Sequence, residues 1–461
     1  MQDNTLDSAK HINNRILTGS ITTNFFSLVI PSLVGLVAFS SASIVDGMFI
    51  GNYVGTPALA AINLIIPYLN VMFGIAFMLS IGGSVIAGKY IGENNLLGAS
   101  NIFSKILMIS VLFSITVTTF SLIFESYIFK ALGATNDLTG LMSDYFKIRI
   151  SFMLVDLITI ALYYFVRTDG RSTLAAIAIV ISSLVNIVLD YYFIAEFNWG
   201  LQGAALATGL AQCISFSVLL AYFFTQHTKF TFRIKQKNWS EVLTGCYNGL
   251  SEFINEVSAN FVAFTLNWLL IIKYGVNGVA AITVINYLLI MGVMLIYSVS
   301  EGGQVFLSQN YGAKNFKRIQ HYFILSMLAC LMLSALCIWL LLGYPQFMIN
   351  LFLDDNSEQA AQLAFQYVEI LWPIFLVNGF TIMISAYFTG LHKPRQSAII
   401  ALLRSLILPA LFLTIFYYWI VDISFLWALP LAEAVTFITA VILFIIYRPE
   451  KIERSVKLAK P

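Results

Sequence analysis

The stretch that decides the fold carries no charged side chain. Residues 47–88 read GMFIGNYVGTPALAAINLIIPYLNVMFGIAFMLSIGGSVIAG. A helix that crosses a membrane needs about 20 mostly apolar residues, so this stretch holds the end of one span and most of a second. Residues 274–300 and 319–353 are likewise free of Asp, Glu, Lys and Arg. Such runs exceed what a core helix of a soluble protein requires, and they predict an all-α integral membrane protein.

The composition of the whole chain supports this prediction. Of the 461 residues, 59% are hydrophobic and 10% are charged, whereas about 25% of residues are charged in soluble domains. The net charge of +2 offers no basic surface, so we expect no nucleic-acid partner. The four cysteines lie in or beside apolar stretches without the spacing of metal ligands. Soluble enzymes, disulfide scaffolds and disordered proteins are therefore excluded.

Apolar segments of sufficient length occur twelve times. We place the predicted spans at 20–48, 57–82, 101–123, 141–166, 173–195, 201–225, 241–272, 279–302, 319–343, 361–390, 396–421 and 424–447. A polar leader without a small-residue cleavage site precedes the first span, so we expect an uncleaved anchor rather than a signal peptide.

Lysine and arginine are concentrated in alternate loops. If the N-terminus lies inside, all but four of the 25 basic residues fall on the cytoplasmic side, where such an excess is usual. The four exceptions are Lys130, Lys147, Arg149 and Lys273. We expect both termini in the cytoplasm and no basic residue in the middle of a span.

The chain also repeats itself at an offset of 220 residues. Gly55 falls on Gly275, and residues 60–62 (AAI) fall on 280–282. The same offset pairs Ser80 with Ser300, Gly82 and Gly83 with Gly302 and Gly303, Gly92 with Gly312, and Asn95 with Asn315. Because six predicted spans fit into this offset, both halves enter the membrane from the same side.

We therefore predict twelve transmembrane helices in two pseudo-symmetric six-helix bundles around a central cavity. The N-terminal bundle comprises residues 1–225, a cytoplasmic linker 226–240, and the C-terminal bundle with a basic tail 241–461. Parallel repeats of this kind are typical of transporters whose halves rock about a central site. A channel or a membrane enzyme has less need of such a repeat.

Polar residues in four spans of the first half lie at similar predicted depths. Asp46, Asp190 and Thr208 fall in the outer parts of their spans, Asn186 lies one turn before Asp190, and Asp156 lies nearer the middle. An ionisable group within the bilayer costs at least ~2.5 kcal/mol and is a functional candidate by default. Such oxygens suit a small cation, or a carboxylate pair that shares a proton. The alternative is a set of unrelated polar residues near the headgroups.

The second half has a different pattern. Glu252, Glu256 and Asn260 form one polar stripe on the seventh span, with Glu256 near the midplane. Further carboxylates lie in later spans, without a basic residue in the same span, at Glu301, Glu369 and Glu433. We expect such groups to hold protons or to face an aqueous cavity, although Glu301 can instead cap a loop. The candidates for a substrate cavity are Glu252, Glu256, Asn260, Glu369 and Asn378.

Several motifs resemble one transporter family. Residues 45–51 (VDGMFIG), with Pro31 before them and 60–63 (AAIN) after them, resemble the first two helices of the multidrug and toxic compound extrusion (MATE) family, close to its MepA-like and DinF-like members. Further motifs with the same resemblance are 185–190 (VNIVLD), 203–208 (GAALAT) and 309–315 (QNYGAKN). Their order and spacing cover nearly the whole chain.

The resemblance implies drug export driven by inward movement of H+ or Na+, with no cofactor besides this ion. It assigns ion coupling to Asp46, Asn186, Asp190 and Thr208, and bending of the first helix to Pro31, where a backbone hydrogen bond is missing. Tyr163 and Tyr164 stand where the family often has Asn, and Ser251 stands where Pro is common. The tyrosines weaken an Na+ site and favour protons, with Asp156 as a substitute ligand.

Four functions compete. A cation-coupled antiporter would export lipophilic organic cations by alternating access, as a monomer in the lipid of the bacterial cytoplasmic (inner) membrane. A flippase for a lipid-linked saccharide would need basic residues within its cavity. An intramembrane enzyme would need a paired-Asp, Ser/His or HExxH constellation, which the four histidines do not form. A channel leaves the repeat unexplained, so we favour the antiporter.

Overall fold

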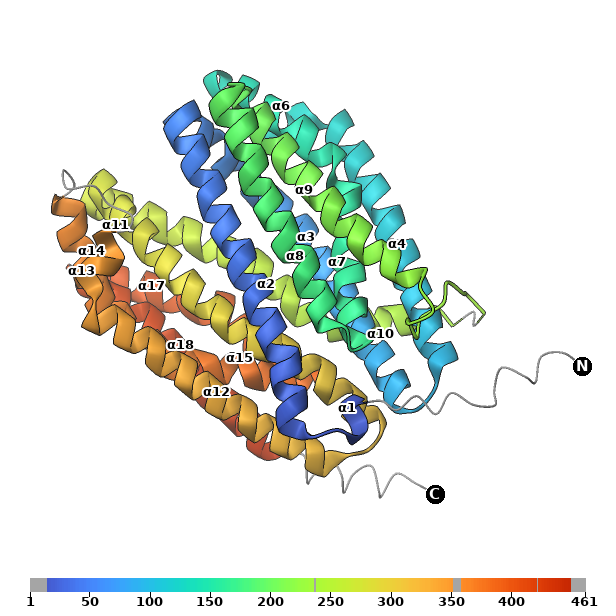
Figure 1. Ribbon diagram of the computed structural model, residues 1–461. Coiled ribbons are helices and arrows are strands. Elements are labelled where there is room, and N and C mark those ends of the chain that lie inside the picture. Colours follow the sequence, from blue (N-terminus) through green and yellow to red (C-terminus); the bar gives the residue numbers. More distant parts are fainter. Residues whose placement is uncertain (1–14, 236–237, 351–357, 421, 449–461) are drawn as a thin grey trace, which may run out of the picture.

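The computed structural model describes residues 15–235, 238–350, 358–420 and 422–448. The described part is helical and contains no strand. Its first half comprises α1 (Arg15–Thr18), α2 (Ile21–Phe49), η1 (Ile50–Val54), α3 (Thr56–Gly92), α4 (Leu96–Ile123), α5 (Glu125–Ala131), α6 (Asn136–Ser151), α7 (Met153–Thr168), α8 (Ser172–Asp190), η2 (Tyr191–Glu196) and α9 (Gly200–Phe223). Figure 1 shows these helices as one group in blue to green.

The second half forms another group, in yellow to red (Figure 1), except that its first helix packs against α3 of the first half. It comprises α10 (Ser240–Asn248), α11 (Leu250–Gly312), α12 (Phe316–Gly343), α13 (Pro345–Asn350), α14 (Glu358–Leu371), α15 (Ile374–Gly390), α16 (Pro394–Leu402), η3 (Leu403–Ile407), α17 (Leu408–Trp419), η4 (Ile423–Trp427) and α18 (Ala428–Ile446). Gly275 divides the long α11, because its backbone (φ 63°, ψ −154°) leaves the helical region. That conformation favours glycine, which has no Cβ.

Twelve membrane spans account for these helices. Within the described residues, ten segments are long and apolar enough to cross a membrane, and two further pairs, α6 with α7 and α14 with α15, are bent by 48° and 55°. Each bent pair counted as one span gives the predicted twelve. The second bend lies at Pro373, which lacks the N–H needed to continue a helix.

One detail differs from the predictions. The seventh span begins at Leu250 rather than at residue 241, because the short helix α10 precedes it as a separate element. Pro31 lies inside α2, and its role in bending stays a prediction.

The inner part of α2 connects the two groups of helices. Phe25, Leu28 and Val29 are buried in the same hydrophobic cluster as residues of α11, α12 and α15. The far end of α2, with Asp46, packs instead near α8 in the first half. The first helix therefore contacts both halves, at different depths.

α3 and α11 approach each other closely enough to exclude side chains. A methyl group at Gly92 would overlap the carbonyl oxygen of Gln309, and one at Gly312 would overlap that of Lys89. A methyl group at Gly82 would likewise overlap the carbonyl oxygen of Gly245. The absence of side chains at these glycines permits the direct backbone contact between the halves.

Candidate functional site

Asp46 and Asp190 lie where an α-helix changes into a π-helix. Asp46 is in the last turn of α2, directly before η1, and Asp190 is the last residue of α8, directly before η2. Single π-helical turns are rare and occur frequently at functional sites. The sequence pattern gave no sign of either turn.

The two aspartates lie close together. Helix α2 packs along α8, and the carboxyl groups of Asp46 and Asp190 are near enough for their charges to interact. Asp190 is fully buried, and neither of its carboxyl oxygens has a hydrogen-bond partner among the described residues. The amide nitrogen of Asn186, one turn earlier, also lacks a partner there. The structure thus brings three of the predicted coupling residues together, with polar atoms available to a ligand.

The other two predicted coupling residues have different surroundings. The hydroxyl of Thr208 donates to the carbonyl oxygen of Ala204 at 3.1 Å, and no described hydrogen bond joins it to the aspartates. Asp156 on α7 forms a buried ion pair with Arg149 at the end of α6. The guanidinium of Arg149 also acts electrostatically on Asp46. The ion pair of Arg149 and Asp156 therefore lies near the aspartates.

Arginines within the spans are a departure from the sequence predictions. Arg149 is only 6% exposed, and Arg404 lies in η3, inside the eleventh span. The expectation that no basic residue lies mid-span is therefore wrong. The spacing of seven residues between Arg149 and Asp156 was a detectable signal, since it places both on one side of a helix.

The polar stripe of the seventh span faces α3. The side-chain nitrogen of Asn260 donates to the carbonyl oxygen of Glu256 at 2.7 Å, and its oxygen accepts a hydrogen bond from Asn70 on α3 at 2.9 Å. The β-carbon of Glu256 lies beside Gly74, which is also on α3. No lysine or arginine of the described chain forms an ion pair with Glu256. The stripe thus lies between the halves.

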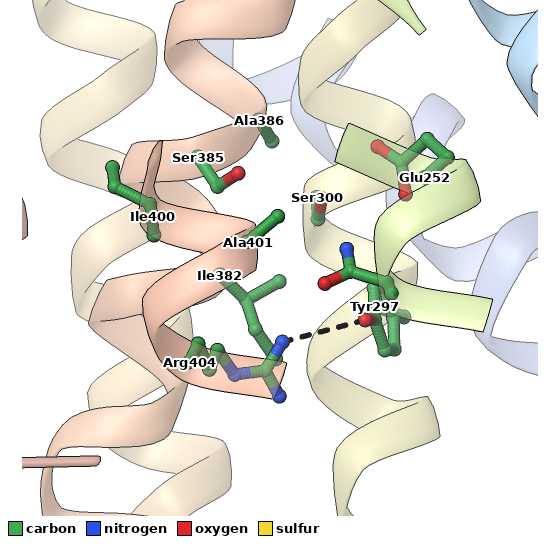
Figure 2. A pocket seen from close by; sticks show the side chains of 10 residues that line it. Glu252, Tyr297, Ser300, Ile382, Ser385, Ala386, Ile400, Ala401 and Arg404 are labelled. Carbon is green, nitrogen blue, oxygen red and sulfur yellow. Dashed lines mark hydrogen bonds between the residues drawn. The ribbon is translucent and has the colours of Figure 1, made fainter. Parts of the chain in front are cut away.

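A small pocket lies beside the start of the seventh span, within the second half (Figure 2). Glu252, Tyr297, Ser300, Ser385 and Arg404 are among its lining residues. Arg404 donates to the hydroxyl of Tyr297 at 3.5 Å, as the dashed line in Figure 2 marks. Glu252 of the stripe therefore lines a pocket of the second half, whereas Glu256 and Asn260 contact α3.

Glu433 of the twelfth span is neutralised by Arg404 from the eleventh. The guanidinium Nε donates to the Glu433 carboxylate at 3.1 Å, and the amide of Asn378 donates to the same oxygen at 2.8 Å. Glu433 therefore has a basic partner, contrary to expectation, and Asn378 belongs to this network. Glu369 is exposed on α14 and does not line the pocket.

Glu301 likewise has a partner, and it does not cap a loop. It lies within α11 and forms an ion pair with Arg167 of α7, at 2.5 Å. Tyr163 and Tyr164 donate to its two oxygens, each at 3.2 Å. This contact is not evident from the sequence, because Arg167 and Glu301 are more than 130 residues apart.

No group of three or more His, Cys, Asp or Glu side chains is arranged to hold a metal ion in the part of the chain that the structure describes. The Asp46–Asp190 group has two carboxylates and an amide, and a guanidinium stands nearby. This donor set suits a singly charged ion or a proton better than a tightly held divalent metal.

The MatE family model matches the chain twice, over residues 31–192 and 253–415. The second match is displaced by 222 residues, from 31 to 253, close to the offset of the internal repeat.

Similar proteins are known in staphylococci. The multidrug export protein MepA of Staphylococcus haemolyticus (strain JCSC1435) is 22% identical over 425 residues, with 92% of each chain covered. MepA of Staphylococcus aureus (strain MSSA476) is 23% identical over 433 residues, which cover 92% of this chain and 93% of that protein.

Solved structures share the fold. The crystal structure of MATE in complex with MaL6 superposes with a TM-score of 0.89 at 21% identity, covering 96% of this chain and 99% of that one. An outward-facing multidrug resistance MATE family transporter gives 0.88 at 22% identity, with coverages of 96% and 98%. The matched family model spans both halves of the helical bundle. The chain therefore belongs to the MatE family, the multidrug and toxic compound extrusion proteins, and it is a multi-pass membrane transporter rather than an enzyme.

Proposed function

We propose that this transporter exports lipophilic organic cations from the cytoplasm in exchange for protons. The observation that carries the proposal is the pair Asp46 and Asp190, close together, with Asp190 buried and both its carboxyl oxygens without hydrogen bonds in the described structure. Two such carboxylates cannot both ionise cheaply in a medium of low dielectric constant. One proton or one Na+ would relieve their repulsion.

Protons are the better-supported coupling ion. Arg149 occupies one oxygen of Asp156, which was the candidate substitute ligand. Fewer oxygens therefore remain to coordinate Na+, whereas a proton needs only one carboxylate oxygen. The hydroxyl of Thr208 donates its proton to the carbonyl oxygen of Ala204. The lone pairs of the same hydroxyl oxygen can still coordinate a cation, so Na+ is the alternative coupling ion.

The substrate class follows from the seventh span. Glu256 lies between the halves and has no ion-pair partner in the described chain, whereas Arg404 and Arg167 are neutralised by Glu433 and Glu301. A cavity with a net negative charge favours cations. A saccharide–pyrophosphate flippase would need unpaired basic groups there, so it has less support. The names of the MepA relatives agree with multidrug export.

Exchange requires only that the coupling ion and the drug stabilise different conformations. With the cavity open outward, the aspartate pair takes up a proton and drug release is favoured; opening inward then releases the proton to the cytoplasm. In this cycle the termini and the 226–240 linker are cytoplasmic, and the monomer is the working unit in the cytoplasmic membrane. Reporter fusions in the linker and after Arg448 test the orientation, since an external signal at either would overturn it.

Transport in proteoliposomes tests the function. Uptake and release of a fluorescent cation are followed while a pH gradient and a Na+ gradient are imposed separately. Proton antiport predicts movement with the pH gradient alone. Movement with only the Na+ gradient would assign Na+ as the coupling ion, and equal export of anionic dyes would contradict the substrate class.

A further inference from the structure

The ion pair between Arg167 and Glu301 is unusual because it joins the two halves of the molecule. Arg167 lies in the last turn of α7 and is 1% exposed. One guanidinium nitrogen contacts Glu301 on α11 at 2.5 Å, and another donates to the hydroxyl of Ser32 on α2 at 2.8 Å. A single side chain thus connects three helices.

Glu301 receives all its described hydrogen bonds from the opposite half. Besides Arg167, the hydroxyls of Tyr163 and Tyr164 donate one bond to each carboxylate oxygen, at 3.2 Å. The Arg167 guanidinium also lies over the ring of Tyr163, 5.2 Å from its centroid. Both tyrosine hydroxyls are therefore engaged by Glu301.

Other contacts between the halves surround this pair. Gln309 on α11 donates to the carbonyl oxygen of Thr168 at 2.7 Å, and Arg318 on α12 donates to that of Gly19 at 2.7 Å. These contacts lie at the end of the molecule where α1 and α10 are found (Figure 1). On the proposed orientation this end faces the cytoplasm.

We propose that Arg167 and Glu301, with Tyr163 and Tyr164, form the lock that keeps the halves together on the cytoplasmic side. The lock rests on the proposed alternating-access function and specifies which contact must break for the inward opening. Separation of the halves takes from Glu301 its ion-pair partner and both tyrosine donors at once. Loss of one member of a buried pair leaves the other charge uncompensated, so removal of either favours an open, hydrated arrangement. Arg167 is thus a positioning residue, since it need not touch the drug or the coupling ion.

The distance between the cytoplasmic ends of the halves tests the lock. Spin labels are placed at Leu97 on α4 and Lys317 on α12, both exposed, after replacement of the native cysteines. Pulsed electron resonance in nanodiscs then gives the distance distribution without drug or gradient. We expect Glu301→Gln and Arg167→Gln to raise the ratio of long to short distances by at least about tenfold. Arg395→Gln, a matched change at an exposed cytoplasmic-side arginine, should leave the distribution unchanged.

The charge swap Arg167→Glu/Glu301→Arg separates the ion pair from simple packing. It should restore short distances that the single variants lose. Unchanged distributions in both folded single variants would overturn the proposal, and so would opening that the swap fails to reverse. Because this readout needs no transport, a protein that fails to exchange protons for drugs can still show the lock, and the converse also holds.

Discussion

The two halves are matched by the same family model, yet one carboxylate in each half has very different surroundings. In the first half, Asp190 has no hydrogen-bond partner in the described chain and lies near Asp46. In the second half, Glu433 is held by Arg404 and Asn378. A paired carboxylate stabilises helix packing, whereas an unpaired one retains affinity for an ion. The comparison teaches that the partner of each carboxylate decides what it can do.

The largest effect is expected in the first half. Asp46→Asn and Asp190→Asn should each reduce proton-driven export in proteoliposomes to the level of vesicles without protein, because the pair can no longer bind and release a proton. Binding of the drug should remain measurable.

Asp137→Asn, at an exposed aspartate near the start of α6, is the control and should export like the wild type. Gradient-driven export at wild-type rates in both site variants would move the coupling site to Glu252 and Glu256.

In the second half, the expected effect is on the free energy of unfolding. Arg404→Gln leaves the buried Glu433 without its cation, and it should lower the free energy of unfolding by about 3 kcal/mol. The double variant Arg404→Gln/Glu433→Gln should recover most of this loss. Thermal unfolding in detergent measures both. If Asp46→Asn proved as destabilising as Arg404→Gln, the contrast between the halves would fail.

A smaller effect is expected on substrate preference. Glu256→Gln should weaken export of cationic dyes several-fold, because the negative charge between the halves is lost, while the folded fraction stays the same. Glu369→Gln serves as the comparison, since Glu369 is exposed on α14. Equal losses in the two variants would show that the loss is not specific to the interface between the halves.

The smallest effect concerns acid stability near His392, in the turn between α15 and α16. Burial, with a lesser contribution from Lys89, lowers the pKa of His392 from its ordinary value of 6.5 to about 3. Between these values the unfolded chain binds a proton that the folded protein does not, so stability falls as the pH decreases below 6.5. His392→Gln should remove on the order of 1 kcal/mol of the loss between pH 7 and pH 5. Identical pH profiles of thermal unfolding would refute this.

The spans could be predicted from sequence because a membrane helix is a local property of about 20 residues. Each carries its own apolar signal, and the bent pairs still read as single spans. The seventh was misplaced at its start, since α10 continues the apolar pattern but is a separate helix.

The ion pairs could not be predicted in the same way. Arg167 and Glu301 are separated by 134 residues and Arg404 and Glu433 by 29, so only the packing of different helices brings them together. The π-helical turns beside Asp46 and Asp190 also leave no sign in the sequence pattern. The predicted group of Asp46, Asn186 and Asp190 rested on depth and resemblance, and its role stays a prediction.

The glycine contacts of α3 with α10 and α11 offer a way to trap a conformation. A single methyl group at Gly82 would overlap the carbonyl oxygen of Gly245, and one at Gly92 would overlap that of Gln309. The backbone cannot move aside as a flexible side chain can, so an alanine at either position should push the two helices apart. The substitution changes no charge and is remote from the aspartate pair. Such variants are therefore suited to holding the two halves apart at these contacts while the ion and drug sites stay intact.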